Sequence, residues 1–125
     1  MAVEHKEKYY EDKIKAVLKR RGAWYIKYWG GGIYTRPGVP DLLACYRGHF
    51  IAIEMKGECG KISELQRAEM AKIESAGGIG MFINPSNMNA LESILDALDD
   101  GIEPAHHTEP ENLKPKKRGR PKKGE

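Results

Sequence analysis

The sequence has no long apolar run, few cysteines and no apolar segment at its start. None of its 125 residues lies in an uninterrupted stretch of about 18 apolar side chains, so no membrane-spanning helix is expected. The first residues, MAVEHKEKYYEDK, are polar and charged, unlike a secretory signal. The two cysteines, Cys45 and Cys59, form no CxxC pair. We therefore expect no structural zinc site, reduced thiols and a cytoplasmic location.

Charge is unevenly distributed along the chain. Residues 1–40 carry a net charge of +5, residues 41–113 carry −8, and residues 114–125 carry +6, within a total of +3. A basic front and a basic tail favour a polyanionic partner, whereas the acidic middle favours a site that requires a cation. The sequence contains no internal repeat.

Hydrophobic periodicity predicts one α/β domain over residues 1–100, with the order α-β-β-β-α-β-α. Helices are expected where apolar residues recur at helical spacing before a glycine, and strands where short apolar runs are bounded by turn residues. The expected helices span residues 9–21, 63–76 and 88–99, and the expected strands span 23–29, 41–46, 49–56 and 79–83.

Composition changes after residue 100. Residues 101–125 hold four of the seven prolines and almost no large apolar side chain. Such a segment buries too little apolar surface to offset the entropy lost on ordering. The sequence therefore predicts a flexible basic tail over residues 101–125.

The stretch GVPDLLACYRGHFIAIEMKG, residues 38–57, reads as a β-hairpin that carries charges at one end. If Arg47-Gly48 form a two-residue turn, Asp41 lies directly opposite Glu54. Lys56 is two residues beyond Glu54 and shares its face of the sheet. Two carboxylates and an ammonium are thus predicted to converge at one end of an apolar sheet.

Opposed carboxylates destabilise a strand pair unless a cation lies between them. Carboxylate oxygens suit Mg²⁺ or Mn²⁺, and Mg²⁺ is commonly held by one or two carboxylates together with water and substrate phosphate. Lys56 would position the attacking water or stabilise developing negative charge. This chemistry is phosphodiester hydrolysis. The alternative is an ordinary solvated strand end with a Glu54–Lys56 surface pair.

These residues resemble the PD-(D/E)xK nuclease superfamily. Pro40-Asp41 corresponds to the PD and Glu54-Met55-Lys56 to the ExK. Within the superfamily, the hairpin, the following GKISELQ and the Gly77-Gly78 pair resemble the VRR-NUC domain, which occurs in phage proteins and in repair nucleases that act on branched DNA. The resemblance spans about residues 8–100 and implies a small restriction-endonuclease-like fold with a central mixed sheet flanked by helices.

The resemblance also implies roles for individual residues. Asp41 and Glu54 would ligate the metal, the carbonyl of Met55 would reach it, and Lys56 would be the catalytic lysine. Gln66 matches the glutamine of the motif on the next helix. Gln66 also fits a capping box with Ser63, in which it would only satisfy the start of that helix.

An acidic residue of the first helix completes the motif. Glu11 matches it, while Glu7 and Asp12 are alternatives for the same role. Glu11 could instead be an exposed partner of Lys15, four residues along the helix. The sequence leaves this choice open.

Basic residues predict contact with DNA phosphates. Arg36, in the segment leading to Asp41, is the candidate nearest the proposed site. The tail KPKKRGRPKKGE resembles an AT-hook, whose core is Arg-Gly-Arg-Pro, and such a segment inserts arginines into a narrow minor groove. Its predicted DNA-binding residues are Lys116, Lys117, Arg118, Gly119, Arg120, Lys122 and Lys123.

The sequence therefore predicts a Mg²⁺- or Mn²⁺-dependent DNA endonuclease with no other small-molecule cofactor and no membrane partner. Family resemblance implies selectivity for branched DNA, as in a junction resolvase. Because one small site cuts one strand, a homodimer is expected for cutting two. The rival prediction is a non-catalytic DNA-binding or architectural module with a nuclease-like fold, in which the tail supplies the activity.

Overall fold

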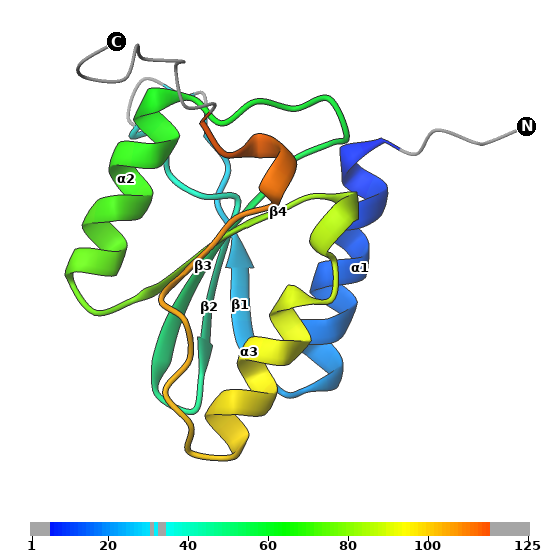
Figure 1. The fold of residues 1–125 in the computed structure, drawn as a ribbon, viewed down its shortest axis with the longest axis vertical. Helices are drawn as coiled ribbons and strands as arrows, with labels where there is room; N and C mark the ends of the chain where they lie inside the picture. Colours follow the sequence, from blue (N-terminus) through cyan, green and yellow to red (C-terminus); the bar gives the residue numbers. More distant parts are fainter. Residues whose placement is uncertain (1–5, 31, 33–34, 116–125) are drawn as a thin grey trace, which may run out of the picture.

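The computed structural model describes residues 6–30, 32 and 35–115 (Figure 1). The predicted order of helices and strands is confirmed, with boundaries within about two residues, and one short strand is added after the last helix. Three α-helices are described: α1 (Glu7–Arg20), α2 (Glu64–Ser75) and α3 (Ala90–Asp99). The strands are β1 (Trp24–Lys27), β2 (Leu42–Tyr46), β3 (His49–Met55), β4 (Ile79–Ile83) and β5 (His107–Thr108).

The strands form one mixed sheet in the order β1-β2-β3-β4-β5. Strand β2 is antiparallel to both β1 and β3, whereas β4 is parallel to both β3 and β5. The parallel β3–β4 connection runs through α2, as a crossover between parallel strands requires. This is an α/β fold with a central mixed sheet flanked by helices, as expected.

Helices cover both faces of the sheet (Figure 1). The larger core lies between the sheet and helices α1 and α3, and it includes Ile14, Leu18, Ile53, Met81 and Leu95, all fully or almost fully buried. A smaller cluster under α2 contains Ala52, Met70 and Phe82. Strands β3 and β4 are buried on both faces, which explains their continuous apolar sequences.

The turn of the β2–β3 hairpin is the predicted two-residue turn. Both Arg47 and Gly48 have positive φ, at 48° and 82°. This conformation matches a type I′ turn, whose twist suits the flanking strands. The turn fixes the register, in which Tyr46 pairs with His49 and Leu42 pairs with Ile53.

The prediction of a flexible tail from residue 101 is wrong for residues 101–115. Strand β5 pairs with β4, and the amide of Gly80 donates to the carbonyl of His106 at 2.8 Å. Arg67 on α2 forms two hydrogen bonds to the carboxylate of Glu109, at 3.0 and 3.1 Å. Directional polar contacts therefore hold a segment that has little apolar surface. Residues 116–125, with the AT-hook-like motif, lie outside the described residues.

Within the described ranges, no helix has the length and apolar composition needed to cross a membrane.

Candidate active site at the end of the β2–β3 hairpin

The hairpin brings Asp41 and Glu54 to the same end of the sheet. Asp41 directly precedes β2, and the observed register continued by one pair sets it opposite Glu54. One carboxylate oxygen of Asp41 accepts a hydrogen bond from the amide of Met55 at 3.0 Å. This contact bridges the ends of the two strands and holds the Asp41 side chain toward β3.

Both carboxyl groups are difficult to ionise in this position. Burial raises the pKa of Glu54 to about 8, the charge of Asp41 adds to the increase, and Lys56 opposes it. Burial also raises the pKa of Asp41, against the hydrogen bond from Met55 and the charge of Lys27. The carboxylates of buried Glu54 and half-buried Asp41 repel each other, so the site favours a cation or a proton.

Lys56 and Gln66 both contact Glu54. The ammonium of Lys56 lies 3.8 Å from Oε2 of Glu54, and its side chain is 13% exposed. Nε2 of Gln66 donates to the same carboxylate oxygen at 3.1 Å. Glu54 is thus held from β3 and from α2, in an orientation that its own strand would not fix.

Gln66 completes the capping box and also contacts Glu54, while its catalytic role stays a prediction. Its side-chain oxygen accepts from the amide of Ser63 at 2.9 Å, and the hydroxyl of Ser63 accepts from the amide of Gln66 at 3.1 Å. This is a complete capping box at the start of α2. Because the oxygen of the amide serves the cap, its nitrogen is turned toward Glu54.

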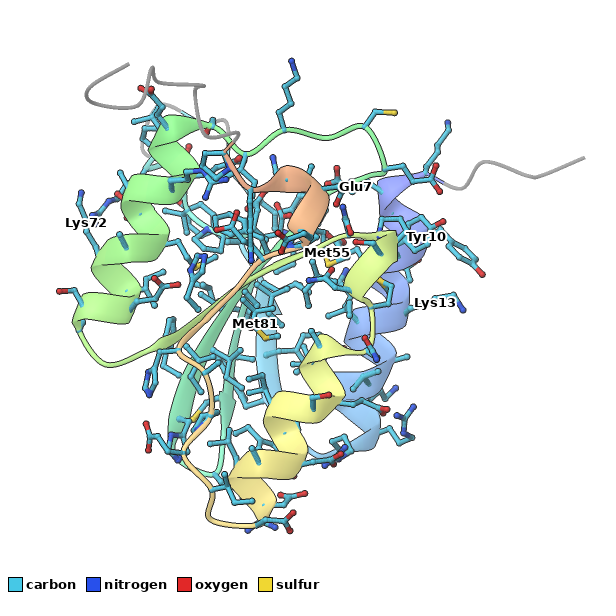
Figure 2. All side chains as sticks on the ribbon, in the orientation of Figure 1. Glu7, Tyr10, Lys13, Met55, Lys72 and Met81 are labelled. Atoms are coloured by element: carbon cyan, nitrogen blue, oxygen red, sulfur yellow. The ribbon has the colours of Figure 1, made fainter. Side chains whose placement is uncertain are left out.

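Helix α1 contributes two acidic residues to the site. Glu11 is buried, 4% exposed, and it forms ion pairs with Lys27 and with Lys15, the latter at 3.2 Å. Glu7 lies one turn earlier, and its pKa is raised first by burial and then by the charge of Asp41. Figure 2 shows Glu7 and Met55 at the same end of the molecule.

These positions narrow the alternatives for α1. The pairing of Glu11 with Lys15 is confirmed, but the alternative in which Glu11 is an exposed helix residue is wrong, because its side chain is buried beside Lys27. Asp12 is exposed and pairs with Lys8, so it is not the buried acid of α1. Glu7 and Glu11, four residues apart on one helix face, are both coupled electrostatically to Asp41, so both remain candidates for the acidic residue of α1.

Lys27 is a site residue that the sequence did not identify. Its ammonium pairs with Glu11, and its charge lowers the pKa of Asp41. Side chains of a strand alternate between its two faces, and this alternation indicates which way Lys27 points. The side chains of Tyr25 and Lys27 are half-buried, whereas those of Trp24 and Ile26 are exposed. Lys27 therefore points inward, although its charge suggests the opposite.

Other residues of the basic front also have acidic partners. Nε of Arg36 lies 2.9 Å from a carboxylate oxygen of Glu69, while the Arg36 side chain remains 61% exposed. Arg20 pairs with Glu92, and Arg21 pairs with Asp96 and Asp99. The contact of Arg36 with DNA remains a prediction. The predicted DNA-binding residues Lys116, Lys117, Arg118, Gly119, Arg120, Lys122 and Lys123 lie outside the described residues.

The described residues include no group of three or more histidines, cysteines and acids arranged to hold a metal. The hairpin end instead offers two carboxylates, from Asp41 and Glu54, together with backbone carbonyls such as that of Met55. This oxygen-only set suits a cation such as Mg²⁺, which keeps several water ligands. It does not suit zinc, which favours nitrogen and sulfur ligands.

No family model and no curated protein matches the sequence. Among solved structures, the chain is similar to a Holliday junction resolvase. That protein is Hjc from Archaeoglobus fulgidus, an archaeal hyperthermophile, with a TM-score of 0.45 and 19% identity over 62% of this chain and 69% of that one. The overlap is partial and the identity low, so no property of Hjc is transferred to this chain.

Proposed function

We propose that this chain is a divalent-metal-dependent DNA endonuclease. The observation that carries the proposal is the pair Asp41 and Glu54, set opposite each other by the hairpin register, with the ammonium of Lys56 at 3.8 Å from Glu54. These are the residues that match the PD and ExK elements of the PD-(D/E)xK nucleases. A solvated strand end does not account for them, because Glu54 is only 5% exposed.

Asp41, Glu54 and the carbonyl of Met55 would hold the metal, as Mg²⁺ or Mn²⁺. When bound, such an ion polarises a phosphoryl oxygen and makes its water a better nucleophile. The raised pKa of Glu54 supports the fit, since a nearby cation would favour the ionised carboxylate.

The chain's own side chains would orient the reaction. Lys56 presents a positive charge beside Glu54 and would stabilise negative charge that develops on the phosphate. Gln66 holds the Glu54 carboxylate in one orientation through its amide nitrogen. Glu11 would act through Lys27, which it positions at the same end of the sheet.

Nicking of a supercoiled plasmid tests this function. We expect nicking in Mg²⁺ or Mn²⁺, none in EDTA, and none with Asp41→Ala, because that variant removes one carboxylate of the proposed pair. Glu58→Ala is a matched control, as Glu58 is an exposed acid in the loop after β3. Nicking that persists in EDTA and in Asp41→Ala would contradict the proposal. DNA binding by the wild-type protein with no nicking in Mg²⁺ or Mn²⁺ would instead favour the rival function, a non-catalytic DNA-binding module.

We propose that the basic tail also binds DNA. Residues 116–125 hold six of the seven lysines and arginines found after residue 113. Their deletion is expected to weaken DNA binding and to reduce the slope of log K against log salt by up to about 5, because each phosphate contact contributes about 0.9. Metal-dependent nicking at low salt should remain. An unchanged salt slope, measured by fluorescence anisotropy, would contradict this role.

We also propose that the protein prefers branched DNA and acts as a homodimer. Each chain carries one candidate site, so two copies related by a twofold axis would cut two strands together. Arg36, whose side chain is 61% exposed, would contact the strand that enters the site. Cleavage rates on linear duplex, flap, splayed and four-way junction DNA, measured with the same preparation, would identify the preferred structure.

A further inference from the structure

Trp29 is the most exposed of the large hydrophobic residues in the described part of the chain. Its side chain is 76% exposed, just beyond the end of β1. A single exposed hydrophobic residue is common on protein surfaces and needs no explanation by itself. Trp29 differs from such a residue because charged side chains surround it.

Trp29 lines a cleft of about 290 Å³ together with three residues of the candidate site, Glu7, Glu11 and Lys27, and with two further lysines. The two further lysines are Lys8 and Lys15. The backbone ties this cleft to the hairpin end, because the amide of Tyr28 donates to the carbonyl of Asp41 at 2.7 Å. Trp29 is the next residue, about 3.8 Å further along the chain between Cα atoms. The indole ring is linked to the hairpin end through Lys27, which contacts the ring and whose charge acts on Asp41.

The position of the ring is held by one of these lysines. The ammonium of Lys27 lies 4.9 Å from the centroid of the Trp29 ring, within the range of a cation–π contact. The same ammonium pairs with Glu11, whose side chain is buried. A buried acid thus fixes the lysine, and the lysine contacts the ring. The high exposure of Trp29 leaves most of the indole surface open to solvent.

An open aromatic face beside clustered ammonium groups fits a nucleotide. Bases stack on aromatic side chains irrespective of sequence, and lysines attract the attached phosphates. In a duplex both faces of each internal base are covered by its neighbours. An unpaired base, by contrast, has a face free for the indole ring.

The geometry points to Trp29 as a stacking platform for an unpaired nucleobase of the DNA strand that enters the candidate active site. This inference rests on the proposed function, because it assumes that DNA lies at the hairpin end. It adds a physical basis for preferring DNA with unpaired nucleotides beside the scissile phosphate over fully paired duplex.

Fluorescence reports on this site directly, because the chain contains two tryptophans. In Trp24→Phe, Trp29 is the only tryptophan. We expect its emission to be quenched on titration with a short oligothymidylate in EDTA, and to be unchanged by an oligonucleotide of equal length whose residues are all abasic. Equal quenching by both oligonucleotides would overturn the inference, since the ring would then sense phosphates rather than bases.

Binding by tryptophan variants gives an independent readout. Trp29→Ala is expected to bind oligothymidylate about tenfold more weakly or worse, whereas Trp29→Phe should recover part of the affinity because it retains an aromatic face. Trp24→Ala is the matched control: Trp24 is 62% exposed but lies five residues earlier on β1, about 17 Å away along a strand. Similar affinities for Trp29→Ala and wild type would overturn the inference.

Cleavage assays separate this inference from the proposed function. Trp29→Ala should lose more activity on a duplex with an unpaired flap than on a fully paired plasmid. Equal losses on both substrates would overturn the stacking role. If the wild-type protein cleaves neither DNA in Mg²⁺ but base-dependent quenching persists, the proposed function fails and the stacking site stands.

Discussion

Replacing Lys56 with methionine is expected to slow DNA cleavage by about 10²–10³-fold, the usual effect of removing one group that stabilises charge in a transition state. The Lys56 side chain is 13% exposed and lies beside Glu54, so its charge acts in a partly desolvated site. Methionine keeps an unbranched apolar stem, which preserves packing. Single-turnover cleavage at saturating Mg²⁺ measures the effect on the chemical step.

Removal of Lys56 has a second effect that would also slow cleavage, and this effect must be distinguished from the loss of transition-state stabilisation. The charge of Lys56 also lowers the pKa of Glu54, so its removal would favour protonation of a proposed metal ligand. A defect caused by protonation would disappear at pH 9 or at higher Mg²⁺ concentration. We expect the defect of Lys56→Met to persist under both conditions, because the missing ammonium acts on the phosphate.

Lys72→Met provides the control for this experiment. Its side chain is 64% exposed on the outer side of α2, away from Glu7 and Met55 (Figure 2). Full activity of Lys72→Met, together with a deficient Lys56→Met, would assign the effect to position rather than to net charge. Wild-type cleavage by Lys56→Met would contradict its catalytic role.

The arrangement of the hairpin could be predicted from sequence because it is local. A two-residue turn at Arg47-Gly48 determines every pair that follows, including the opposition of Asp41 and Glu54. The capping box at Ser63 is equally local, and the inward direction of Gln66 follows from helical spacing. These features depend on residues close in sequence.

The contribution of α1 could not be chosen from sequence, because it depends on how the helix docks on the sheet. Glu7, Glu11 and Asp12 are chemically similar and lie within two turns. Packing of Ile14 and Leu18 into the core sets the rotation of the helix. That rotation buries Glu11 beside Lys27 and leaves Asp12 exposed.

Strand β5 was missed for a related reason. It has two residues, and its sequence shows no apolar alternation. Its attachment depends on distant partners, such as Arg67 on α2, which contacts Glu109, and Asn84 after β4, which donates to Asn112 at 3.0 Å. Composition measures the capacity to bury apolar surface, and it cannot detect an ordered segment held by polar contacts.

At the hairpin end, two like charges lie opposite each other, an arrangement that strand pairs normally avoid. Opposed like charges destabilise a ladder, and here Glu54 is also buried while Asp41 is half-buried. Such a local conflict is expected where function requires it, and the rest of the fold must offset it. The conflict has a measurable consequence, because the metal-free protein should be more stable without one of the two charges.

Glu54→Gln is therefore expected to stabilise the metal-free protein at alkaline pH. The pKa of Glu54 is about 8 in the folded state, against an ordinary value of 4.5. Between these values the folded state binds the proton and the unfolded state does not, so wild-type stability falls as pH rises from about 4.5 to about 8. Each pKa unit corresponds to about 1.4 kcal/mol, which gives a loss on the order of a few kcal/mol. Glutamine cannot ionise, so this loss disappears.

Chemical denaturation in EDTA at pH 5 and pH 8 measures the difference. Glu54→Gln should match wild type at pH 5 and exceed it at pH 8, whereas Glu58→Gln, at an exposed position, should follow wild type at both. Mg²⁺ should restore wild-type stability at pH 8, because it favours the ionised carboxylate, and should leave Glu54→Gln unchanged. A wild-type protein equally stable at both pH values in EDTA would show that Glu54 ionises freely. The hairpin end would then lack the electrostatic conflict that a divalent cation relieves.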